Sequence, residues 1–264
     1  MPRSNRFLLV EKEIENVMKI KFDTSDVDLD RMQLGFLSAR LKNGYGLSPN
    51  EKNQYLGLQI YFNKNFDIEK DKANIIDSES GNIKDDIQYY YLKVKFVNSE
   101  TNKEEIKELE TLIKIRAQTN VSLLIAELNR ASEKIKDTIT SNQATFKSLV
   151  KLCTNFESDL LLPHKIPIWW DFERFLHIYL RHVKEIKMGE RFEDKTIFQY
   201  KLEDVKFIIK AVLQIVYNEI EEFFNSNPNK NFVRIGKRSI AYDGNYYRVE
   251  VEPNGRLITF HPHI

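Results

Sequence analysis

The sequence predicts an α+β protein with a largely helical N-terminal domain, residues 1–163, and a small α+β domain, residues 164–264. Apolar residues recur at helical spacing through the first part, which contains few prolines and glycines. After Pro163 and Pro167, which end a helix and hold the chain extended, short β-branched and aromatic runs alternate with turn sequences. We therefore expect the second domain to contain two helices followed by a four-stranded antiparallel meander.

Amphipathic patterns predict the helices of the N-terminal domain, and Ser48-Pro49 opens the second of them. These predicted helices span residues 31–41, 50–62, 104–116, 120–139 and 144–153. The polar segment 66–87 is expected to form a loop. The run 88–97 is rich in aromatic and β-branched residues, which predicts a strand.

The C-terminal domain begins with two amphipathic segments, residues 171–188 and 202–225, which predict helices. The four predicted strands that follow are residues 231–236, 238–243, 246–252 and 255–260. The sequences "DGN" and "PNG" precede the last two strands and supply Asn and Gly, which tolerate positive φ. Hairpin turns are therefore expected at both places.

Composition excludes some classes of function. The 40 basic and 39 acidic residues nearly cancel, so net charge does not identify a partner. A single cysteine, Cys153, excludes an internal disulfide framework and a multi-cysteine metal site. No apolar run approaches the roughly 18 residues of a membrane span, and the N-terminus lacks a signal-peptide core. We expect a cytoplasmic protein with no membrane association.

The first helix of the C-terminal domain carries a basic stripe at spacing i, i+3, i+7 and i+10. The stripe consists of Arg174, His177, Arg181 and Lys184. His182 lies apart from it, at the margin of the apolar face. Helix statistics favour a solvated surface with no further role. The lack of acidic partners within the stripe favours instead an anion-binding surface for a phosphate diester.

Histidine beside arginine also suits RNA cleavage without a metal. One group takes the proton of the 2′-OH, another donates a proton to the leaving 5′-oxygen, and a cation stabilises the charge on phosphorus. The predicted sheet is locally basic as well, which favours a polyanionic partner.

Residues 165–264 resemble the barnase–EndoU–colicin–RelE-like (BECR) ribonucleases of bacterial toxins and phage-associated proteins. The resemblance rests on "HIYLRH" at 177–182, a second amphipathic helix, four strands, and the ending "GRLITFHP" at 255–262. It implies acid–base roles for His177 and His182, phosphate binding by Arg181, and a hydrogen bond from Thr259 to the scissile phosphate. Residues expected to bind RNA are Arg174, Lys184, Arg234, Arg238, Tyr247 and Arg248.

Two points in this prediction stay open. Strand alternation allows at most one of Tyr247 and Arg248 to point into the site. If His182 is half-buried, His261 is the second acid–base group instead.

The first prediction for function is thus a metal-independent endoribonuclease, a toxin-like or anti-phage effector that needs no cofactor. The N-terminal helices would bind a trigger or inhibitor protein, or form a homo-oligomer. The alternative is a non-enzymatic helical interaction protein whose C-terminal module binds RNA or protein, and a third is a structural protein without a ligand.

Overall fold

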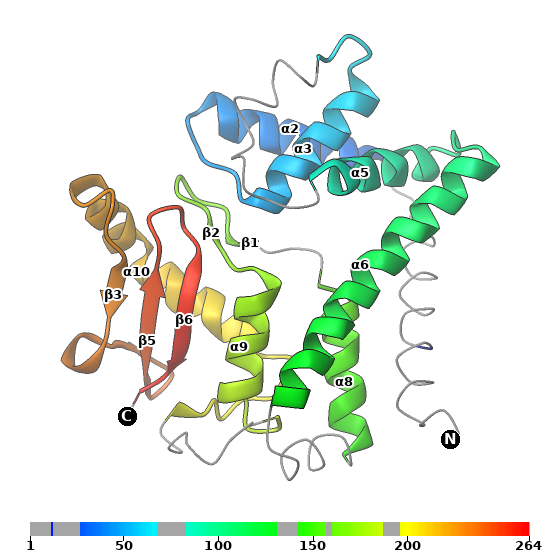
Figure 1. Cartoon of the computed structure of the whole chain (residues 1–264). Coiled ribbons are helices and arrows are strands. Elements are labelled where there is room, and N and C mark those ends of the chain that lie inside the picture. Colours follow the sequence, from blue (N-terminus) through cyan, green and yellow to red (C-terminus); the bar gives the residue numbers. More distant parts are fainter. Residues whose placement is uncertain are drawn as a thin grey trace. The chain divides into compact units, whose positions relative to one another are not determined.

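The computed structural model describes residue 12 and residues 27–67, 83–130, 142–156, 160–186 and 196–263 (Figure 1). Over these ranges the fold is α+β, as predicted, with seven α-helices and a C-terminal antiparallel four-stranded sheet. The chain divides into two compact units, residues 1–123 with 149–158, and residues 124–148 with 159–264. None of the described helices has the length and apolar character needed to cross a membrane.

Three predicted N-terminal helices are confirmed. They are α2 (Val27–Lys42), α3 (Pro49–Phe62) and α8 (Gln143–Thr154). The start of α3 is fixed by a capping box, in which Ser48 N–H donates to Glu51 Oε2 at 2.9 Å and Glu51 N–H donates to Ser48 Oγ at 3.4 Å. The segments 104–116 and 120–139 belong to one continuous helix as far as it is described, α6 (Lys103–Arg130), and residues 131–139 lie outside the described ranges.

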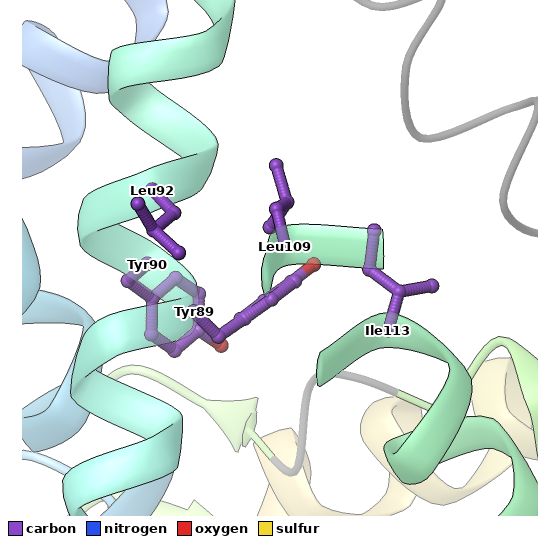
Figure 2. Packing of buried hydrophobic residues seen from close by; sticks show 5 residues of the cluster. All are labelled: Tyr89, Tyr90, Leu92, Leu109 and Ile113. Atoms are coloured by element: carbon purple, nitrogen blue, oxygen red, sulfur yellow. The ribbon is translucent and has the colours of Figure 1, made fainter. Parts of the chain in front are cut away.

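The predicted strand at 88–97 is wrong, because these residues belong to a helix, α5 (Ile83–Val97). The buried cluster in Figure 2 joins one side of α5 to α6; it consists of Tyr89, Tyr90, Leu92, Leu109 and Ile113. This burial outweighs the strand preference of tyrosine and valine. The helix also takes the end of the loop expected at 66–87, of which residues 68–82 lie outside the described ranges.

From residue 160 onward, the second unit begins with a small antiparallel hairpin, β1 (Leu160–Leu162) and β2 (Ile168–Trp169). Two helices follow, α9 (Phe172–His182) and α10 (Val205–Ser226). The four-stranded sheet contains β3 (Phe232–Arg234), β4 (Ile240–Tyr242), β5 (Asn245–Val251) and β6 (Leu257–Pro262).

The strand order differs in one respect from a simple meander. Strand β5 is central: β6 pairs with one of its edges, while β3 and β4 pair with the two halves of the other. A 3₁₀ turn at Gly236–Arg238 separates β3 from β4, which therefore do not pair with each other. Both predicted hairpin turns are confirmed, with positive φ at Asp243, Gly244 and Gly255.

The two faces of the sheet have different environments. Tyr247, Val249 and Val251 are fully buried on one face, where the rings of Tyr247 and Phe260 stack with centroids 5.3 Å apart. Helix α10 lies behind the sheet and α9 beside β6 in Figure 1. Arg248 and Glu250 alternate with the buried residues and lie on the other face, named here the open face.

Candidate active site

Both ends of α9 are held in place. At its start, Asp171 caps the helix by accepting a hydrogen bond from Arg174 N–H at 2.8 Å. The other carboxylate oxygen of Asp171 accepts from Arg256 Nε at 2.8 Å, and Arg256 follows the turn between β5 and β6. Trp169 N–H also donates to Gly255 O at 3.0 Å. These contacts hold the start of α9 against the turn between β5 and β6.

Helix α9 ends at His182, several residues earlier than the predicted span 171–188. Val183 adopts extended angles, φ −89° and ψ 123°, and forms a bridge with Phe198. The Phe198 N–H donates to His182 O at 2.7 Å, which replaces the next helical hydrogen bond. Lys184 is therefore exposed beyond the helix end and does not continue the basic stripe.

Three imidazole rings gather where the end of α9 meets β6. The ring centroids of His177 and His182 lie 6.1 Å apart. The rings of His182 and His261 are stacked, with centroids 4.6 Å apart and planes inclined by 20°. The prediction that His177 and His182 occupy different helix faces holds for their positions on the wheel, but their rings approach each other at the helix end.

The hydrogen bonds of two rings assign their tautomers. The Nδ1 atom of His182 lies 3.0 Å from Thr196 O, and the Nδ1 atom of His261 lies 2.7 Å from Pro262 O. Because a carbonyl oxygen only accepts, Nδ1 carries the proton in each ring and Nε2 is the basic nitrogen of the neutral form.

Burial separates the roles of the three histidines. His182 is 4% exposed, whereas His177 and His261 are partly exposed. Only His177 and His261 are therefore accessible to a bound molecule. His182 is suited to holding His261 in position, so the structure favours His261 as the second acid–base candidate.

The surroundings of all three rings disfavour the charged form. Burial, with Arg181 and Arg174 adding positive charge, lowers the pKa of His177 to about 4. Burial, with His261 next in weight, lowers the pKa of His182 to about 3. Burial, opposed by the hydrogen bond to Pro262 and assisted by Arg248, lowers the pKa of His261. The rings are therefore neutral near pH 7.

Two arginines near these rings are weakly neutralised. Arg248 is the cross-strand partner of His261, and its closest acidic contact among the described residues is Glu250 at 3.6 Å. Arg174 has Glu173 at 4.0 Å. In both arginines the Nε atom is buried and has no hydrogen-bond partner among the described residues. These groups suit a phosphate, which accepts hydrogen bonds from guanidinium.

The remaining predicted residues divide between the two faces of the sheet. Thr259 lies on the open face, two positions before His261 and opposite Glu250. Tyr247 lies in the core, with its hydroxyl 3.4 Å from that of Tyr200. Arg234 forms an ion pair with Glu219 of α10, away from the open face.

Arg238 is exposed in the 3₁₀ turn, and no contact among the described residues joins it to the histidines. Arg181 is exposed on α9, on the same helix as His177 and one position before His182. The structure thus brings together His177, His182, Arg174, Arg181, Arg248, His261 and Thr259.

One aromatic side chain of the open face, Tyr246, was missed from the sequence. The alternation in β5 contained the signal, because an inward Tyr247 requires Tyr246 to share the face of Arg248. Within the described ranges, no three His, Cys, Asp or Glu side chains form a group that could hold a metal ion.

Comparisons with protein-family models, curated proteins and solved structures find no match to this chain. The function of the site therefore rests on its own geometry and charges.

Proposed function

We propose that the C-terminal unit is a metal-independent endoribonuclease, acting in the cytoplasm as a toxin-like or anti-phage effector. The observation that carries this proposal is the gathering of His177, His182 and His261 beside weakly neutralised arginines. Two accessible imidazoles and a guanidinium are the groups that transesterification requires.

The proposed reaction forms one P–O bond, breaks another and needs no reactant besides the RNA. One neutral imidazole, His177 or His261, takes the 2′-OH proton while the 2′-oxygen forms a bond to phosphorus. The bond from phosphorus to the 5′-oxygen breaks, and the other ring, as imidazolium, donates a proton to that oxygen. The products are a 2′,3′-cyclic phosphate and a 5′-hydroxyl. Arg248 and Arg181 bind the phosphate oxygens and Thr259 adds a hydrogen bond.

Substrate binding would supply the missing acid. In the free protein, burial and neighbouring cations lower the pKa of His177 and His261. A bound phosphate adds negative charge beside both rings, which raises their pKa toward the working range. The site therefore needs its anionic substrate in order to hold one imidazolium.

The test is cleavage of RNA by the purified protein in EDTA, with analysis of the product ends. His177→Ala is expected to lower the rate by roughly 10²–10⁴-fold, and Arg181→Lys to impair it despite the retained charge. The matched control is His164→Ala, which should leave the cleavage rate unchanged. The His164 ring stacks on Tyr217 of α10 and hydrogen-bonds Gln214, and it is not one of the three clustered rings. Absence of cleavage, or full cleavage by a His177→Ala/His261→Ala double variant, would refute the proposal.

One observation favours a second function, RNA or protein recognition without cleavage. All three rings are neutral in the free protein, so an imidazolium acid is not preformed. Tight binding of RNA that remains intact would support this alternative. Under either function, the helical N-terminal unit would bind a trigger or inhibitor protein or form a homo-oligomer.

A further inference from the structure

The open face of the sheet carries a row of cross-strand neighbours from β5 and β6. Arg248 pairs with His261, and Glu250 pairs with Thr259. The ladder extends by one more step, in which His263 N–H donates to Tyr246 O at 2.6 Å. Tyr246 is therefore two residues from Arg248 on the same face, at about 6.7 Å along the strand.

Tyr246 is a large aromatic residue that is 55% exposed and lies on the same face as Arg248. Its neighbour Tyr247 is fully buried in the core. The residue opposite Tyr246 on β4 is Ala241, whose small side chain does not cover the ring of Tyr246. Core packing therefore does not explain the ring, and the small neighbour leaves space against it.

We propose that Tyr246 stacks on an unpaired base next to the phosphate held by Arg248, and that the site takes single-stranded RNA. The inference rests on the proposed function for the position of that phosphate. An exposed aromatic ring beside a cation is how proteins bind single strands, since every base offers a stacking face. In an RNA duplex the base faces are covered, so Tyr246 has nothing to stack on.

The face carries both signs of charge, because Glu250 lies 3.6 Å from Arg248, and the groups suited to a nucleic acid strand are the ring, the guanidinium and the hydroxyl. Arg248 has a buried Nε atom without a hydrogen-bond partner among the described residues, next to His261. Thr259 adds a hydroxyl further along β6. An aromatic ring, a guanidinium and a hydroxyl thus follow one another along the face, as base stacking and backbone contacts require.

The experiment measures the affinity of the full-length protein for a fluorescent RNA strand carrying 2′-fluoro groups, which cannot undergo transesterification. Tyr246→Ala is expected to raise the Kd by roughly 5- to 150-fold. Tyr246→Trp keeps an aromatic ring and is expected to retain the affinity of the unaltered protein. The matched control is Phe207→Ala, which removes an aromatic ring that is 67% exposed on α10 and should leave the Kd unchanged. The same strand in a duplex should bind less tightly, with no dependence on Tyr246.

The outcomes separate this inference from the proposed function. If the protein cleaves RNA but Tyr246→Ala binds the single strand like the unaltered protein, the inference is wrong and the nuclease stands. If Tyr246 governs single-strand binding but RNA is never cleaved, the stacking role stands and the nuclease is wrong. Equal losses on single strand and duplex would overturn the preference for single strands.

Discussion

The rings of His182 and His261 stack with centroids 4.6 Å apart, which joins the last residue of α9 to β6. His182 is buried and bonded through Nδ1 to Thr196 O, so it provides a fixed surface for the partly exposed ring of His261. The position of an acid–base candidate on the sheet thus depends on the end of a helix.

The two histidines should respond differently to substitution. His261→Ala should lower the cleavage rate by roughly 10²–10⁴-fold with little loss of stability, because this side chain exchanges a proton. His182→Ala should lower the free energy of unfolding by about 1–3 kcal/mol, because it leaves a buried space beneath His261. Rate measurements paired with denaturant unfolding distinguish the two effects. A His182→Phe variant that keeps the ring stack yet loses as much activity as His261→Ala would contradict a positioning role.

The stability of the protein should fall as pH decreases below about 6.5. Both His177, with pKa about 4, and His182, with pKa about 3, bind protons more weakly when folded than the ordinary histidine value of about 6.5 in the unfolded chain. At pH values between the folded pKa and 6.5, the unfolded state holds more protons than the folded state. Lowering the pH through this range therefore stabilises the unfolded state and reduces the free energy of unfolding. Each histidine contributes at most about 1.4 kcal/mol per pH unit, and less where water screens it.

Urea unfolding at pH 7.5 and pH 5 checks this prediction. The His182→Phe variant removes one titrating group and should show a smaller decrease. An unchanged free energy of unfolding across this range would mean that the imidazoles are not buried as described.

The helices of the C-terminal unit and the four strands could be predicted because their patterns are local. Apolar spacing marks α9 and α10, and turn residues with positive φ mark the hairpins. The opposite directions of Tyr247 and Arg248 also followed from alternation. The helix at α5 could not be predicted from local preference, because its tyrosines are stabilised by burial against α6.

The candidate site was only partly predictable. The residues from α9 share one sequence motif, whereas the contact between His182 and His261 arises from tertiary packing that no local pattern encodes. The extended conformation of Val183, which removes Lys184 from the helix, depends on the bridge to Phe198. One division between the two compact units falls within α6, between residues 123 and 124, and it likewise depends on long-range contacts. The domain boundary at residue 163 stays a prediction.

Gly255 should be far less tolerant of substitution than Gly244. Both have positive φ, at 86° and 71°, so alanine is strained at either position by about 1–2 kcal/mol. At Gly255 an added Cβ would also lie 1.9 Å from Pro167 O, whereas nothing lies within 4 Å at Gly244. Gly255→Ala should therefore reduce the free energy of unfolding clearly more than Gly244→Ala, as measured by urea denaturation. Equal losses would show that the close approach of Pro167 to this turn is absent.

Asp171 should contribute to stability in two separable ways. One carboxylate oxygen caps α9 through Arg174 N–H, and the other binds the guanidinium of Arg256. Asp171→Asn keeps a capping acceptor but weakens the charged pair, whereas Asp171→Ala removes both. The alanine variant should therefore lose about 0.5–2 kcal/mol more in the free energy of unfolding than the asparagine variant.

The same pair of variants tests whether the start of α9 controls the site at its end. Loosening α9 from the turn before β6 should disturb the spacing of His177 and His261, so kcat should fall in both variants while the proton-transfer groups remain. The matched control is Lys165→Ala, which removes an exposed ion pair with Glu221 and should change neither quantity by much. If Asp171→Ala unfolds like the unaltered protein, the cap and the Arg256 contact do not hold the helix. If its stability falls but kcat is unchanged, the position of α9 is set by the His182–His261 stack alone.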